Sequence, residues 1–242
     1  MVQRTISSDE RRELRRAAGC GSWARSCFLP ARQVKALMSG LVVTIVGDIF
    51  KEGVSATFHH VIKGRVDKAK AILLEELEKG SATLFDVSDV DEVAAMVFEY
   101  ITAAQRGAAR MNLRILAQVF SGIVSAKPVY ADDFLRWSSD LSTLSREEAI
   151  ALGVIYKNDV KARSLVDVKQ EDRVNSAFTA TREELIGPDK LFKNDDEFGA
   201  LFGALVRTGL VVPWPGFDNL IYSASEKLRK LMSLADIESA AD

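Results

Sequence analysis

Three arginines in the middle of the chain, Arg106, Arg110 and Arg114, have the residue type and spacing of an anion-binding surface. A spacing of four residues places side chains on one face of a helix, and the neighbouring Ala103 and Gly107 leave that face uncrowded. A guanidinium group offers a planar fork of N–H donors that matches the oxygens of a phosphate. The pattern therefore predicts contact with an anion, unless these arginines are simply exposed or pair with acidic residues on neighbouring helices.

A second group of arginines lies near the N-terminus, where Arg11, Arg12, Arg15 and Arg16 follow a helical spacing. Residues 1–35 contain eight Lys and Arg against three Asp and Glu, whereas the whole chain has a formal net charge of -2. Lysines and arginines bind nucleic-acid backbones and anionic lipids through their charge. This segment is therefore either an arm that binds such a surface or a solvated extension, and we predict a basic, flexible tail over residues 1–30.

Residue patterns typical of enzymes are missing from the sequence. It contains no Walker-type loop, GxGxxG, HExxH or GxSxG motif. The adjacent His59 and His60 would point about 100° apart on a helix, so they are poorly placed to hold one metal ion. Cys20 and Cys27 are the only cysteines, which argues against a disulfide scaffold and favours the cytoplasm. We infer no catalytic residue, cofactor, metal or small-molecule substrate, although Asp and Glu sites that assemble only in the fold stay open.

The elements that carry these residues are mostly helices. From Ser88 to Ser125 apolar residues recur at steps of three and four, which is the period of a helix with one buried face. A glycine inside a helix costs about 1 kcal/mol relative to alanine, so a kink or break is expected near Gly107. The apolar run Leu37 to Val46 is shorter than the roughly 20 residues of a membrane span. It predicts a buried or interfacial helix.

The C-terminal residues have a different order of elements. A helix capped by Asn194 ends at Gly209, and two short strands, 210–212 and 220–222, flank a turn and precede a last helix. This order resembles the end of a winged-helix domain. The first turn of the capped helix is acidic, 195–197, which argues against the reading of DNA by that helix.

Two aromatic residues in the turn between the strands, Trp214 and Phe217, are candidate contacts for a protein partner. Aromatic side chains contribute strongly to binding at protein interfaces. The alternative is that both side chains fold back onto the core of the module.

The overall prediction is a mainly α protein, with a helical bundle followed by a small winged-helix-like module that contains one β-hairpin. We expect a helical domain over residues 31–158, a charged connector over 159–180 and the module over 181–242. The module is expected to open with a helix whose capping box is Thr181–Glu184.

Two stretches of the C-terminal half, Phe134 to Ala149 and Leu205 to Tyr222, are similar to the Abi-alpha family of bacterial helical proteins associated with abortive infection. The resemblance implies a role in phage defence or prophage regulation. It supplies no catalytic residues to carry over to this chain.

We therefore expect a cytoplasmic, non-enzymatic regulatory or defence-associated protein that acts through a protein partner or through self-association. One alternative is a nucleic-acid-binding regulator that uses the N-terminal arginines and the 106–114 stripe. Another is a peripheral membrane protein held by 37–46 and the basic tail.

Overall fold

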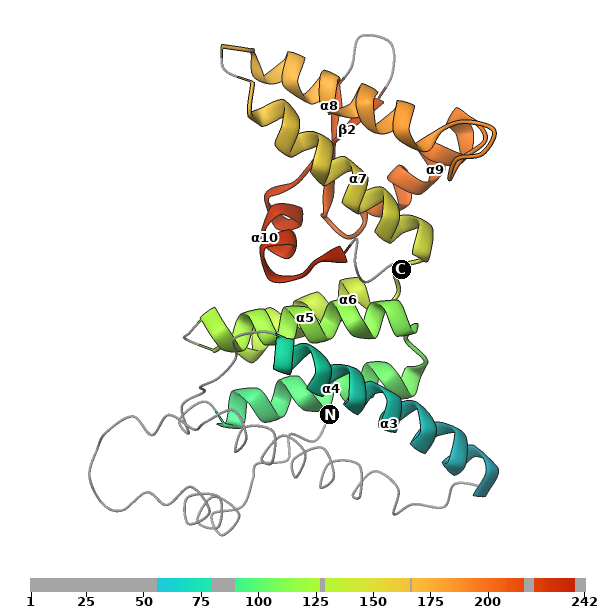
Figure 1. The fold of residues 1–242 in the computed structure, drawn as a ribbon, viewed down its shortest axis with the longest axis vertical. Helices are drawn as coiled ribbons and strands as arrows, with labels where there is room; N and C mark the ends of the chain where they lie inside the picture. Colours follow the sequence, from blue (N-terminus) through green and yellow to red (C-terminus); the bar gives the residue numbers. More distant parts are fainter. Residues whose placement is uncertain (1–55, 80–89, 127–128, 166, 216–219, 238–242) are drawn as a thin grey trace, which may run out of the picture. The chain divides into compact units, whose positions relative to one another are not determined.

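The computed structural model describes residues 56–79, 90–126, 129–165, 167–215 and 220–237. These residues are mainly helical, with a two-stranded antiparallel hairpin near the C-terminus (Figure 1). The predicted fold class is therefore confirmed. None of the described helices combines the length and the apolar character that crossing a bilayer requires. The arginines at 11, 12, 15 and 16 and the apolar run 37–46 lie outside the described residues.

The chain divides into two compact units, Met1–Ser142 and Thr143–Asp242. This division lies earlier than the predicted end of the helical domain at residue 158. The predicted connector over 159–180 is also largely helical, because α7 (Arg146–Arg163) extends into it and α8 (Gln170–Leu185) begins within it. Only three residues of α8 are buried, so its sequence is mostly polar and shows little of the apolar period that predicts a helix.

The predicted capping box at Thr181 is a further correction. Thr181 lies inside α8, where its hydroxyl donates to the Ala177 carbonyl oxygen at 2.7 Å. A hydroxyl that bonds the carbonyl four residues earlier is compatible with a helix interior, so the capping-box pattern here does not mark a helix start.

The first unit contains α3 (Ala56–Lys79), α4 (Val90–Arg106), α5 (Arg110–Ala126) and α6 (Ala131–Leu141). Helices α3 and α6 each pack against both α4 and α5. Large side chains fill the core between them, and Phe120 and Phe134 meet edge to face with ring centroids 5.5 Å apart. The buried Tyr100 hydroxyl donates to the Ala69 carbonyl oxygen at 3.0 Å, which satisfies its polar group within the core.

The predicted break at Gly107 is present. Helix α4 ends at Arg106, and Gly107 has a φ of +96°, which a glycine adopts without the steric cost of a Cβ. The Gly107 amide donates to the Ala104 carbonyl oxygen at 3.2 Å, and the Ala108 amide donates to that of Ala103 at 3.0 Å. This pair of hydrogen bonds is the Schellman arrangement, which satisfies the last carbonyl groups of a helix.

The second unit contains α7, α8, α9 (Asp195–Val206), the strands β1 (Val211–Pro215) and β2 (Leu220–Ala224), and α10 (Glu226–Leu234). Apart from α8, the helices of this unit start at the predicted caps. Ser145 and Glu148 form a reciprocal capping box on α7, Asn194 caps α9, and Ser225, rather than Ser223, caps α10. The order helix, hairpin, helix predicted for the C-terminal module is therefore observed.

Candidate functional site

The hairpin of the second unit carries exposed apolar residues on both of its strands. Its register pairs Val211 with Ala224 and Pro215 with Leu220. Val212 and Leu220 are 40% and 55% exposed, whereas Trp214 is half-buried. Phe217 lies outside the described residues. The hairpin thus presents apolar side chains, including a predicted aromatic contact, to its surroundings.

The two prolines of β1 occupy particular positions in the strand ladder. The Ser225 amide donates to the Leu210 carbonyl oxygen at 3.0 Å, so residues 210 and 225 form a hydrogen-bonded pair. Hydrogen-bonded and non-hydrogen-bonded pairs alternate along an antiparallel ladder, which places Pro213 and Pro215 in non-hydrogen-bonded pairs. The backbone N atoms of these prolines therefore face away from β2, where the lack of a donor weakens no bond of the hairpin.

The outer edge of β1 is consequently poor at pairing with another strand. Two of the three positions whose N–H would point outward along β1 are prolines, which have no N–H to donate. Strand β2 packs against α7 and α8, whereas β1 packs against α9. The free edge of the sheet therefore offers little backbone hydrogen bonding.

A cluster of aromatic rings holds the inner face of the hairpin. The Tyr222 ring on β2 lies 5.4 Å from Phe202 of α9 and 6.0 Å from Phe178 of α8, measured between centroids. Phe198 continues the cluster at 4.5 Å from Phe202, and Phe192 lies 5.9 Å from Phe198. Because these rings join α8, α9 and β2, the exposed residues of the hairpin are carried on a packed support.

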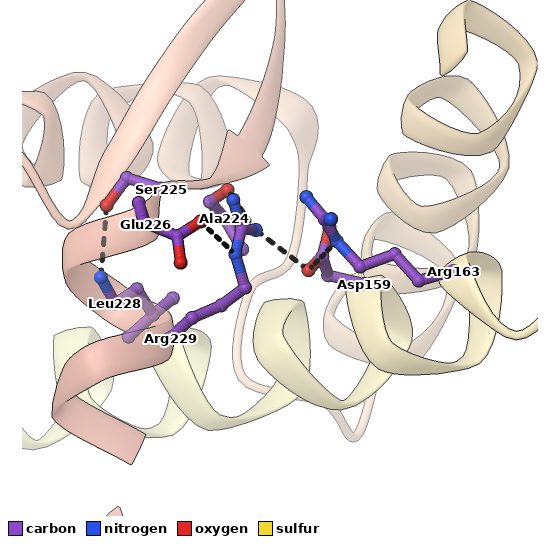
Figure 2. Close-up of polar contacts among 7 residues, drawn as sticks. All are labelled: Asp159, Arg163, Ala224, Ser225, Glu226, Leu228 and Arg229. Carbon is purple, nitrogen blue, oxygen red and sulfur yellow. Dashed lines mark hydrogen bonds and ion pairs between the residues drawn. The ribbon is translucent and has the colours of Figure 1, made fainter. Parts of the chain in front are cut away.

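The end of the hairpin is held by a charged network around Asp159 of α7 (Figure 2). The Nη1 atom of Arg229 on α10 lies 3.0 Å from Oδ2 of Asp159 and also donates to the Ala224 carbonyl oxygen at 2.8 Å. The same Asp159 oxygen accepts from Nε of Arg163 at 2.9 Å, and Nε of Arg229 donates to Glu226 at 3.0 Å. Arg229 and the buried carboxylate of Asp159 thereby connect α7, α10 and the last residue of β2. Sequence reasoning did not identify this network, because its members are far apart in the chain.

A second charged contact within the second unit connects the end of α9 to the start of α7. The Nη2 atom of Arg207, just after α9, lies 3.2 Å from Oε1 of Glu148 in the first turn of α7. Glu148 is also the capping-box residue that accepts from the Ser145 amide at 2.8 Å. The single arginine near the C-terminal end of α9 therefore has an internal partner.

The start of α9 is acidic and partly neutralised from within the unit. Asp195 accepts two hydrogen bonds of 2.6 Å from Arg182 of α8. The hydrogen bonds and charge of Arg182 lower the pKa of the Asp195 carboxyl. Asp196 and Glu197 are exposed beside this pair. The negative carboxylates at the start of α9 repel the negative phosphate backbone of DNA, so this end of the helix is unsuited to contact with DNA.

The exposed side of α9 is built from small residues. Gly199 and Gly203 are one turn apart, and a Cβ added at either position would meet no atom within 4 Å. Ala200 and Ala204 are exposed on the same helix. Neither glycine is therefore needed to avoid a clash within the second unit.

The arginines predicted as a single stripe in the first unit do not share one helix. Arg106 is the last residue of α4 and Arg110 the first of α5, so the break at Gly107 separates them. Arg114 is turned toward α3, with its Nη2 atom 3.9 Å from Oε1 of Glu75 and its Nε atom 3.7 Å from Oε1 of Glu76. The prediction of one common helical face was therefore wrong. Arg114 instead pairs with acidic residues on a neighbouring helix, which was the alternative interpretation.

A further arginine, which sequence reasoning missed, lies beside the break between α4 and α5. The Nη1 atom of Arg65 on α3 lies 3.2 Å from the position that a Cβ would occupy on Gly107. Arg65 is 41 positions from Arg106 in sequence, so no local pattern reports this proximity.

His60, one of the two adjacent histidines, is exposed near the start of α3. In the described part of the chain, no group of three or more His, Cys, Asp and Glu residues is arranged to hold a metal ion.

Searches of this chain against protein-family models, curated proteins and solved structures find no match. The resemblance to the Abi-alpha family stays a prediction.

Proposed function

We propose that this chain is a non-enzymatic regulatory protein of the cytoplasm that acts by binding a protein through the hairpin of its second unit. The exposed apolar side chains of β1 and β2 are the observation that supports the proposal. From Leu210 to Ser225 the sequence contains one charged residue, Asp218. An apolar surface with so few charges favours a partner that is itself apolar at the contact, rather than a nucleic acid.

The mode of contact follows from the prolines of β1. Because Pro213 and Pro215 leave the outer edge poor in N–H donors, the partner is expected to cover side chains rather than to add a strand. Val212 and Trp214 lie on one face of the hairpin, where Val212 provides exposed apolar area and Trp214 is the aromatic residue most suited to anchor the contact, whereas Leu220 is exposed on the opposite face. A role in phage defence rests on the family resemblance alone and is the specific form of regulation that we expect.

The proposal can be tested by photo-crosslinking in cells. A photoreactive amino acid would be placed at position 212 or 220, and at Leu165 as a matched control, since Leu165 is also exposed and lies after α7. We expect crosslinks from 212 to one protein, either a second copy of this chain or a different protein, and none from 165. Crosslinks from 220 to the same protein would show that it covers both faces of the hairpin. Mass spectrometry of the crosslinked species would identify it.

A variant of the surface separates specific contact from chance proximity. The substitution of Trp214 by Ser in the crosslinking protein is expected to abolish the crosslink while the helical circular dichroism signal is retained. Crosslinking that survives this change, that occurs equally from position 165, or that captures RNA in place of protein would overturn the proposal.

A further inference from the structure

Three arginines from three different helices lie around the turn between α4 and α5. Arg106 ends α4, Arg110 begins α5, and the guanidinium group of Arg65 on α3 lies over Gly107 between them, with its Nη1 and Cζ atoms 3.2 and 3.8 Å from the Cβ position. All three are exposed. We call these three residues the arginine corner.

Two carboxylates of α3, Glu75 and Glu76, are engaged one turn further along α5. Among the described residues, no ion-pair contact within 4.0 Å involves a member of the arginine corner, whereas Arg114 has both Glu75 and Glu76 near it. Glu75 and Glu76 also bind Lys79, at 2.6 and 3.0 Å. The Glu75 carboxyl has a lowered pKa, caused first by the hydrogen bond from Lys79 and only weakly by the charge of Arg110. The corner therefore keeps an excess of positive charge.

The helix dipoles account for only two of the three arginines. Arg65 and Arg106 lie at the C-terminal end of α4, where a positive charge is favoured. Arg110 lies in the first turn of α5, which contains no acidic residue and where a positive charge is disfavoured. An anion that contacts all three guanidinium groups would offset both the mutual repulsion of the arginines and the unfavourable position of Arg110.

We propose that the arginine corner binds a compact phosphate group, as inorganic phosphate or as the phosphate of a small monoester. A guanidinium group binds phosphate oxygens in pairs, and three such groups match the number of terminal oxygens of a monoester. The acidic residues that follow limit the ligand to this size. An extended nucleic-acid backbone running along α5 would meet Glu75 and Glu76, whose charge repels it.

Gly107 is part of the same arrangement. Its positive φ turns the chain so that Arg106 and Arg110 lie at one corner, and its missing side chain leaves room for Arg65, since a Cβ would come within 3.2 Å of Nη1. Gly107 therefore both separates α4 from α5 and leaves the space in which the guanidinium group of Arg65 lies.

Titration calorimetry of the full chain with inorganic phosphate, and separately with glycerol phosphate, tests the proposal. Replacing Arg65, Arg106 and Arg110 by glutamine removes the charges but keeps side-chain length. Each removed guanidinium is expected to weaken phosphate binding by about tenfold, because each supplies charge-assisted hydrogen bonds. Arg136→Gln is the matched control, since Arg136 is an exposed arginine of the same unit on α6.

The thermal unfolding midpoint provides a second readout. Phosphate is expected to raise the midpoint of the wild type and of Arg136→Gln, and to leave the triple variant unchanged. The triple variant without phosphate should unfold no earlier than the wild type, because it has lost a repulsion. The basic N-terminal residues are retained in every variant, so binding by them would persist in the triple variant.

Three results would overturn the proposal. The first is no phosphate binding by the wild type, and the second is equal binding by the wild type and the triple variant. The third is a short DNA duplex that binds more tightly than phosphate with the same dependence on the three arginines, which would make the corner a nucleic-acid interface instead.

Discussion

The Nη1 atom of Arg229 lies 3.0 Å from Oδ2 of Asp159, although the two residues are 70 positions apart in the chain. Asp159 is buried on α7 and accepts from two arginines, while Arg229 also bonds the Ala224 carbonyl at the end of β2. Arg229 thereby links the end of β2 to the buried carboxylate on α7, in addition to the direct packing of β2 against that helix.

Asp159→Asn should loosen this attachment. Asparagine keeps the size of the side chain but loses the charge that both arginines require, so we expect the free energy of unfolding of the second unit to fall by about 2 kcal/mol. Urea unfolding measures the change. Glu226→Gln is the control, because Glu226 binds the same Arg229 but is 89% exposed, and the loss there should stay below about 0.5 kcal/mol. Equal losses for the two variants would show that burial of Asp159 is not what gives the contact its strength.

Gly107→Ala should destabilise the first unit. Alanine at a φ of +96° is strained, and its Cβ would lie 3.2 Å from Nη1 of Arg65, so we expect a loss of about 1–2 kcal/mol. The measurement is the thermal or urea unfolding of the full chain. An unchanged stability would mean that the turn after α4 adopts another conformation at little cost.

Gly203→Ala should have the opposite effect. The position lies inside α9, and a Cβ there would meet nothing within 4 Å, so alanine is expected to stabilise the second unit by about 0.5–1 kcal/mol. Gly199→Ala provides an independent repeat on the same helix. Destabilisation by both substitutions would indicate that the exposed side of α9 is covered in the intact protein.

The pair of Arg182 and Asp195 should make a pH-dependent contribution to stability. Arg182 lowers the pKa of the Asp195 carboxyl in the folded chain relative to its ordinary value. A lowered folded-state pKa means that the contribution is present above the unfolded-state pKa and is lost as the pH falls through the folded one. The wild type should therefore exceed Arg182→Gln in stability at neutral pH, and the difference should vanish under acidic conditions. Carbon-detected NMR titration of Asp195 would show its pKa rising in the variant. A difference in stability that persists after the carboxyl is protonated would exclude the ion pair as its cause.

Local signals in the sequence were sufficient for much of the fold. The break at Gly107 and the caps at Ser145 and Asn194 depend on residues within a few positions of one another, and all three are present. The hairpin was likewise predicted from two short apolar runs, although residues 213–215, which were predicted as part of the turn, belong to β1. Helix α8 was missed because it is mostly polar, and a charged segment predicts a connector as readily as an exposed helix.

The candidate sites depend more on contacts that are distant in sequence. A spacing of four predicted one surface for Arg106, Arg110 and Arg114, but Gly107 separates the first two and Glu76 engages the third. The position of Arg65 over Gly107 follows from how α3 packs against α4 and α5. Such packing is not expressed in any local pattern, so the arginine corner could only be recognised in the structure.

The prolines of β1 have a consequence for how this chain behaves at high concentration. An apolar strand with a free edge is a template on which further chains can stack into cross-β fibrils. Pro213 and Pro215 remove the donors that such stacking needs, so the hairpin can keep Val212 and Leu220 exposed without seeding a fibril. Replacing both prolines by threonine would restore those donors, and we expect it to make the edge of β1 more prone to such stacking.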